Sequence, residues 1–166
     1  RPDRLRDHCS GRGRDLASTG AVSSATLQRM TEPPAIDRAA VPAFWERAQA
    51  FGAIPSDREF AGSVERFGDS AELADELLDL VLHGPKRATA ESVAAFEHAG
   101  EALPVVGDLW IAADGSGRPR AVLRTTEVRT GPLSSVDDAF AWDEGEGDRS
   151  RSMWLTDHEA FFRRQL

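Results

Sequence analysis

The stretch HGPKRATAES, residues 83–92, contains Lys86, the one lysine in a chain with nineteen arginines. A desolvated ammonium can lose its proton, whereas a guanidinium stays charged, so this lysine indicates a task that arginine cannot perform. Thr89 follows three residues later, a spacing that puts both side chains on one face of a turn or helix. Lys86 and Thr89 therefore fit a general base and the nucleophile that it activates, with the charge of Arg87 beside them.

A structural interpretation of the same residues stays open. Lys86 would then only neutralise carbonyl groups at the end of a preceding helix. Thr89 would only cap the following helix, with Ser92 at its third position. Spacing alone does not separate the two interpretations.

An acidic stretch supplies a candidate third member. Six acids lie between residues 137 and 148, and Glu144 stands where a predicted helix gives way to Gly145. A carboxylate at such a point can be directed into a cleft. The alternative is a solvated acidic face, on which Asp143 or Glu146 would serve as well as Glu144.

Four further residues are candidates for binding a substrate. Arg124, on the second predicted strand, can hold a phosphate or a base edge, although an exposed arginine on a strand needs no such explanation. Arg87, beside Lys86, is the second basic candidate. Trp154 and His158 lie four residues apart on the last predicted helix. Core packing is the favoured interpretation for Trp154, and the role of His158 stays open.

Neither a metal nor a cofactor is expected. The histidines form no HxH or HExxH pattern, and the single cysteine lies far from them, at residue 9. The glycine-rich DGSG at residues 114–117 joins two predicted strands, so we interpret it as a turn and not as a phosphate loop.

The elements that must position these residues follow from periodicity and from helix-end signals. A helix is predicted from Pro42 to Gly52. A second follows a capping-box-like pair, Asp69 and Glu72, and ends at Gly84. Residues 91–99 form a third short helix, and 107–114 and 118–130 form two strands of a hairpin. A Ser-capped helix and a final helix over 148–166 complete an α+β fold.

Composition sets the broad class of the protein. The 166 residues suit one domain, with 40% hydrophobic and 29% charged residues, and show neither a membrane span nor a secretory signal, so we expect a cytoplasmic protein. The net charge is −8, but residues 1–29 carry six Arg and three Asp, which leaves −11 for residues 30–166. An acidic body disfavours extended DNA as a partner, while a small nucleoside or a short RNA still fits. The lack of an apolar span leads us to expect no membrane partner.

The first 36 residues lack a sustained apolar period and are predicted to be a disordered tail. The chain begins with Arg1, and Met30 is an alternative start. A basic arm that binds an anionic partner is the other interpretation. With either interpretation of the tail, the predicted domain spans residues 37–166.

Four blocks in order give a family resemblance: FGDSAELADELLDLVLHGPKRATAES, LPVVGDLWIAADGSGRPRAVLRTTEVRTGPLSSVD, FAWDEGEGDRS and WLTDHEAFF. Over roughly residues 40–166 they resemble the bacterial single-domain branch of the ASCH (activating signal cointegrator homology) domains. The resemblance implies a small PUA-like β-barrel with surrounding helices and a cleft for a nucleoside or RNA.

What the resemblance implies for activity differs among members. Some are similar to amidohydrolases that deacylate N4-acetylcytidine with a Lys, a Thr three residues later and a distant Glu, which correspond to Lys86, Thr89 and Glu144. The alternative is an RNA-binding module or a ribonuclease. Related domains continue past the HEAFF helix into a barrel strand, so we expect that strand to be missing here, with an open edge that can pair with another chain.

Overall fold

The computed structural model describes residues 33–52 and 54–165, and within them it has an α+β fold, as predicted. The order of elements is α1 (Val41–Ala50), β1 (Val64–Glu65), α2 (Ala71–Leu82), α3 (Val93–Ala99), β2 (Leu109–Ala113), β3 (Pro119–Arg124), α4 (Asp138–Glu144) and α5 (Arg151–Gln165). Two short 3-10 helices, η2 (Arg38–Ala40) and η3 (Leu133–Ser135), precede α1 and α4. None of the described helices is long and apolar enough to cross a bilayer.

The three strands form an open sheet in the order β1-β2-β3. The predicted hairpin is confirmed, because β2 and β3 pair antiparallel, with Leu109 opposite Arg124. β3 ends at Arg124, earlier than the predicted strand. The two residues of β1 pair with β2 in parallel. Closure into a barrel is not seen among the described residues and stays a prediction.

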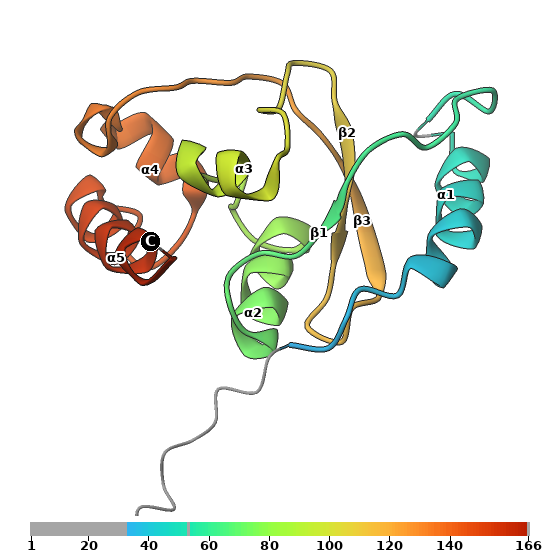
Figure 1. The fold of residues 1–166 in the computed structure, drawn as a ribbon, viewed down its shortest axis with the longest axis horizontal. Helices are drawn as coiled ribbons and strands as arrows, with labels where there is room; N and C mark the ends of the chain where they lie inside the picture. Colours follow the sequence, from blue (N-terminus) through green and yellow to red (C-terminus); the bar gives the residue numbers. More distant parts are fainter. Residues whose placement is uncertain (1–32, 53, 166) are drawn as a thin grey trace, which may run out of the picture. The chain divides into compact units, whose positions relative to one another are not determined.

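Alternating side chains of β2 divide the core between the two faces of the sheet. On one face, Leu109, Ile111 and Ala113 of β2 pack in one cluster with Val41 and Trp45 of α1. On the other face, Ala112 packs with Leu77 and Leu78 of α2 and with Phe67. Figure 1 shows α1 and α2 on opposite sides of the strands.

The helix caps differ in part from the predictions. Ser70, and not Asp69, caps α2 by accepting a hydrogen bond from the Leu73 amide, and the helix ends at Leu82, two residues before Gly84. Ser92 caps α3 by accepting from the Ala95 amide, so Thr89 is not the cap. The glycine expected after this helix, Gly100, takes the left-handed conformation.

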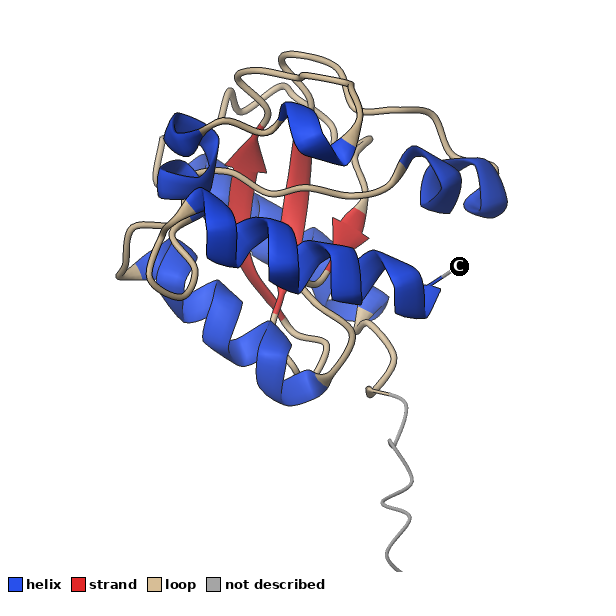
Figure 2. Ribbon diagram, turned by 90° about the vertical axis from the view of Figure 1, so that its left-hand side faces the viewer, coloured by secondary structure: helices blue, strands red, loops and turns tan. Residues whose placement is uncertain are grey.

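The last two helices carry the acidic stretch and the aromatic residues. Asp137, and not a serine, caps α4, and Gly145 ends it in the left-handed conformation. The Ser150 hydroxyl accepts from the Met153 amide in the first turn of α5. In Figure 2, α5 crosses in front of the strands.

The folded part begins before residue 37. The described residues, 33–52 and 54–165, form one compact unit. Ile36 packs against the core beside α1, and the Asp37 amide donates to the Gly117 carbonyl in the β2-β3 turn. At least Ile36 of the predicted tail therefore contacts the domain, while residues 1–32 of that predicted tail lie outside the described residues. The boundary at residue 37 stays a prediction.

Candidate active site

Lys86 is buried between two carboxylates from the far end of the sequence. Its Nζ lies 2.5 Å from Glu144 Oε2 and 2.5 Å from Glu146 Oε1. The Phe67 ring lies 5.6 Å from the same atom, and the Glu144 carbonyl accepts a longer hydrogen bond at 3.4 Å. The Lys86 backbone amide donates to the Leu80 carbonyl at the end of α2, which holds the residue in place.

The backbone explains how two segments almost 60 residues apart in the chain meet here. The Asp143 carbonyl, at the end of α4, accepts hydrogen bonds from the amides of Arg87 and Ala88 at 2.6 and 3.0 Å. Gly145 has φ +72°, and a Cβ added to it would lie 2.7 Å from the Lys86 backbone nitrogen. Only glycine fits this close approach, so the glycine after Glu144 is needed to dock the end of α4 on Lys86.

The loop that carries Glu146 is held against α4. The Arg149 amide donates to the Glu146 carbonyl at 2.9 Å. The guanidinium of the same arginine donates two hydrogen bonds to the Trp142 carbonyl and stacks over the indole at 3.6 Å. Glu146 is therefore presented to Lys86 by a loop with defined contacts.

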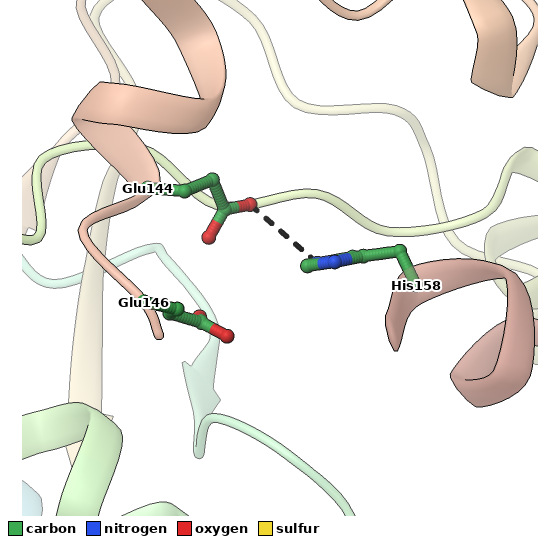
Figure 3. Close-up of side chains that lie close together, drawn as sticks. All are labelled: Glu144, Glu146 and His158. Atoms are coloured by element: carbon green, nitrogen blue, oxygen red, sulfur yellow. Dashed lines mark ion pairs between the residues drawn. The ribbon is translucent and has the colours of Figure 1, made fainter. Parts of the chain in front are cut away.

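α5 brings His158 to the other side of Glu144. His158 Nε2 lies 3.8 Å from Glu144 Oε1, the contact marked in Figure 3. The imidazole stacks on the Trp154 indole with 3.9 Å between centroids, and Trp154 packs edge-on against Phe140 of α4. The aromatic contacts between α4 and α5 thus fix the histidine beside the carboxylate.

Burial dominates the electrostatics of this cluster. It raises the pKa of Glu144 to about 7, although the adjacent Lys86 charge and hydrogen bond act to lower it and Glu146 acts to raise it. Burial also lowers the pKa of His158, against the opposing charge of Glu146. At neutral pH the Glu144 carboxyl is therefore poised between its two protonation states, and the imidazole is neutral.

Two of the four side chains in this cluster reach solvent and two do not. The side chains of Lys86 and Glu144 are each 1% exposed, whereas those of Glu146 and His158 are 30% and 13% exposed. A molecule that approaches Glu144 from solvent would meet Glu146 or His158 first.

Glu144, Glu146 and His158 also offer donor atoms that lie within 4.8 Å of one another, a spacing that a metal ion can bridge. However, the two carboxylates already hold the Lys86 ammonium at 2.5 Å. A divalent cation would have to share this space with the ammonium, against charge repulsion. We therefore assign none of these residues as metal ligands, and the expected absence of a metal stays a prediction.

The structure brings together four of the predicted site residues and not the other three. Lys86, Glu144, Trp154 and His158 form one cluster, with Trp154 buried behind the histidine. Thr89 is exposed, and no hydrogen bond to its hydroxyl is found among the described residues. The Arg87 guanidinium turns back to the Val81 and Lys86 carbonyls, and Arg124 is exposed at the end of β3.

Glu146 and Gly145 have more definite roles here than the sequence analysis gave them. The sequence offers Glu146 only as an alternative to Glu144, but in the structure both carboxylates bind Lys86. The Glu-Gly-Glu spacing was the available signal, because a left-handed glycine between two acids can turn both side chains toward one cation. Phe67, which places its ring near the ammonium, carried no such signal.

Comparison with known proteins gives a consistent family relationship. The ASCH domain family model matches residues 63–166. The chain is similar to the crystal structure of protein EF3133 from Enterococcus faecalis, with 32% identity and a TM-score of 0.67, over 77% of this chain and 76% of that chain. It is also similar to an ASCH domain structure from Lactobacillus crispatus, with 28% identity and a TM-score of 0.64, over 74% and 79% of the two chains. A search of curated proteins found no match. Since the family match covers more than half of the sequence, the chain belongs to the ASCH domain family.

Proposed function

We propose that this ASCH domain is an amidohydrolase that removes the acyl group from a small modified nucleoside such as N4-acetylcytidine. The observation that carries the proposal is the buried pair of Lys86 and Glu144, 2.5 Å apart, in which Glu144 has a pKa of about 7. A carboxyl that changes protonation near neutral pH, in contact with an amine, is suited to acid–base catalysis.

In the proposed reaction the Glu144 carboxylate accepts a proton from the Lys86 ammonium and leaves a neutral amine. The amine takes the proton of the Thr89 hydroxyl as its oxygen attacks the amide carbonyl, and then passes that proton to the leaving nitrogen. The C–N bond breaks and an acyl ester forms on Thr89, which water hydrolyses to release the acid. Because Thr89 is exposed in the free protein, this sequence requires the segment of residues 86–89 to bring its hydroxyl to the amine.

The proposed binding side is the partly exposed rim of the cluster. His158 would contact the nucleoside there, with Trp154 supporting its ring from behind. Arg87 and Arg124 are proposed to reach more distant polar groups. The PUA-like barrel that the family resemblance implies belongs to this proposal, because such a barrel offers a cleft for a nucleoside.

The test is hydrolysis of N4-acetylcytidine, followed by the ultraviolet change as cytidine appears. We expect turnover by the parent protein and a loss of about 100-fold or more in Lys86→Arg and Glu144→Gln, the usual contribution of acid–base groups. Thr89→Ala should abolish turnover with an unchanged melting temperature, because this side chain is exposed. Arg129 and Glu127 form an exposed ion pair, so Arg129→Lys and Glu127→Gln serve as controls for the changes at the buried pair of Lys86 and Glu144. Both controls should leave turnover unchanged.

A folded parent that does not hydrolyse this substrate would contradict the proposal as stated. Short single-stranded RNA would then be titrated at two salt concentrations. Affinity that falls with salt would support the alternative of an RNA-binding module or ribonuclease.

A further inference from the structure

The two carboxyl oxygens of Glu144 have different surroundings. Oε2 accepts from the Lys86 ammonium, whereas Oε1 is fully buried and has no hydrogen-bond partner among the described residues. Leaving a buried carboxylate oxygen unpaired is costly. Figure 3 shows that His158 is the side chain directed at this oxygen, at 3.8 Å.

The hydrogen bond at the other ring nitrogen determines which tautomer of His158 faces Glu144. His158 Nδ1 lies 3.1 Å from the Trp154 carbonyl, and a carbonyl can only accept, so Nδ1 carries the hydrogen. In the neutral ring Nε2 is then a bare acceptor. Stacking on Trp154, with 15° between the planes, and edge contact with Phe162 fix this orientation.

An acceptor nitrogen therefore faces an acceptor oxygen in a buried site. One proton between them satisfies both atoms, after a small side-chain rotation that shortens 3.8 Å to hydrogen-bond length. We propose that Glu144 Oε1 and His158 Nε2 share one proton, which makes His158 a positioning residue that sets the protonation state of Glu144. The role of this pair in turnover rests on the proposed function, but the shared proton itself does not.

The other charged groups around the pair oppose one another. The Lys86 ammonium on Oε2 favours the ionised form of Glu144, and Glu146 favours the protonated form. Asp157, next to His158 on α5, and Glu146 favour a protonated imidazole, while Lys86 disfavours it. His158 adds a lone pair, which stabilises the protonated carboxyl. Loss of that nitrogen should therefore lower the pKa of Glu144.

The experiment follows the Glu144 carboxyl carbon by ¹³C NMR in protein labelled at the glutamate side chains, without substrate. His158→Phe keeps the aromatic stack and removes Nε2. We expect the Glu144 titration midpoint to fall by at least about 0.5 pH units, a shift worth about 0.7 kcal/mol. The amide oxygen of His158→Gln can replace the lost acceptor. In this variant the Glu144 midpoint should therefore lie closer to that of the parent than in His158→Phe. His98→Gln, at an exposed histidine on α3, should change nothing.

Two results would overturn the inference. The first is an unchanged Glu144 midpoint in folded His158→Phe. The second needs no variant. When the parent loses the shared proton, the His158 Nε2 ¹⁵N resonance and the Glu144 ¹³C resonance should change in the same step, with one common midpoint. If the two resonances instead titrate in separate steps, the proton is not shared.

Activity separates this inference from the proposed function. If N4-acetylcytidine is turned over, the acid limb of kcat/KM should move to lower pH in His158→Phe, together with the NMR midpoint, because the reaction needs ionised Glu144. A coupled midpoint without turnover would support the shared proton and reject the amidohydrolase. Turnover with separate midpoints for Glu144 and His158 would support the amidohydrolase and reject the shared proton.

Discussion

Asp114 and Glu144 are both buried carboxyls, with 8% and 1% of the residue exposed, but their surroundings act in opposite directions. Asp114, in the β2-β3 turn, accepts hydrogen bonds from the Ser116 amide and hydroxyl, the Arg118 amide and the Arg120 guanidinium. Burial acts to raise its pKa, but these donors together hold the pKa below the ordinary value. For Glu144, burial outweighs Lys86, and the pKa rises to about 7.

The difference shows that the supply of donors, and not burial alone, decides what a buried acid can do. Asp114 stays ionised and holds a turn together. Glu144 has one oxygen without a donor, so it exchanges a proton near neutral pH, which acid–base chemistry requires. The following variants test this comparison.

The largest effect is expected from removing the buried cation. Lys86→Ala leaves the buried Glu144 carboxyl without the ammonium and next to the partly exposed Glu146. Breaking a buried pair in this way costs about 3–5 kcal/mol of unfolding free energy. Urea unfolding at pH 7.5 measures the loss. The double variant Lys86→Met/Glu144→Leu should recover most of it, and a loss below about 1 kcal/mol in Lys86→Ala would place the pair among weak surface contacts.

The sequence identified this pair only in outline. Lys86 stood out because the chain has no other lysine, and Glu144 because it precedes a glycine. Local patterns also predicted the hairpin and the helices, whose periodicity is contained within each segment. That both Glu144 and Glu146 bind Lys86 depends on contacts across about 60 residues, which periodicity does not encode.

The errors have a similar origin. Ser70 rather than Asp69 caps α2, and Asp137 rather than a serine caps α4, because neighbouring capping residues compete and the backbone conformation chooses between them. The two-residue strand β1 is too short for any alternation to be visible. The Arg87 guanidinium donates to the Val81 carbonyl of α2 and to the Lys86 carbonyl, contacts that no local pattern encodes, while its role in binding stays a prediction.

The glycine that docks Glu144 on Lys86 should give the second largest effect. Gly145 and Gly100 both have a left-handed backbone, but a Cβ on Gly145 would meet the Lys86 backbone, while one on Gly100 meets nothing within 4 Å. We expect Gly100→Ala to cost about 1–2 kcal/mol, the price of the left-handed conformation alone. Gly145→Ala should cost more, because the clash is added. Urea unfolding compares them, and equal losses would mean that the close approach at Lys86 contributes nothing.

The pH dependence of stability sharpens the contrast between the two acids. Between pH 4.5 and about 7 the folded state holds a Glu144 proton that the unfolded chain has lost, so this group makes stability fall as pH rises. Asp114 acts in the opposite sense: its stabilisation is present above its ordinary pKa and is lost as pH falls through the lowered value. Each slope is at most about 1.4 kcal/mol per pH unit.

Glu144→Gln and Asp114→Asn separate these two contributions in urea unfolding from pH 3 to 8. As pH rises from 4.5 to 7, the free energy of unfolding of the parent should fall relative to that of Glu144→Gln. The parent should have a larger free energy of unfolding than Asp114→Asn by a constant amount above pH 5, and this advantage should shrink toward pH 3. Parallel curves for parent and Glu144→Gln would show that Glu144 has an ordinary pKa.

The smallest effect is expected at the cation of the β2-β3 turn. Arg120 lies 3.1 Å from Asp114, but its side chain is 51% exposed, so solvent screens the pair. Arg120→Gln should therefore cost only about 0.2–1 kcal/mol, as for exposed ion pairs. Asp114 keeps its three donors from Ser116 and Arg118, so its pKa should remain below the ordinary value, which ¹³C NMR of aspartate carboxyls measures. A loss as large as that of Lys86→Ala, or a normal Asp114 pKa, would mean that one cation controls each acid, and that the supply of local donors does not distinguish the two sites.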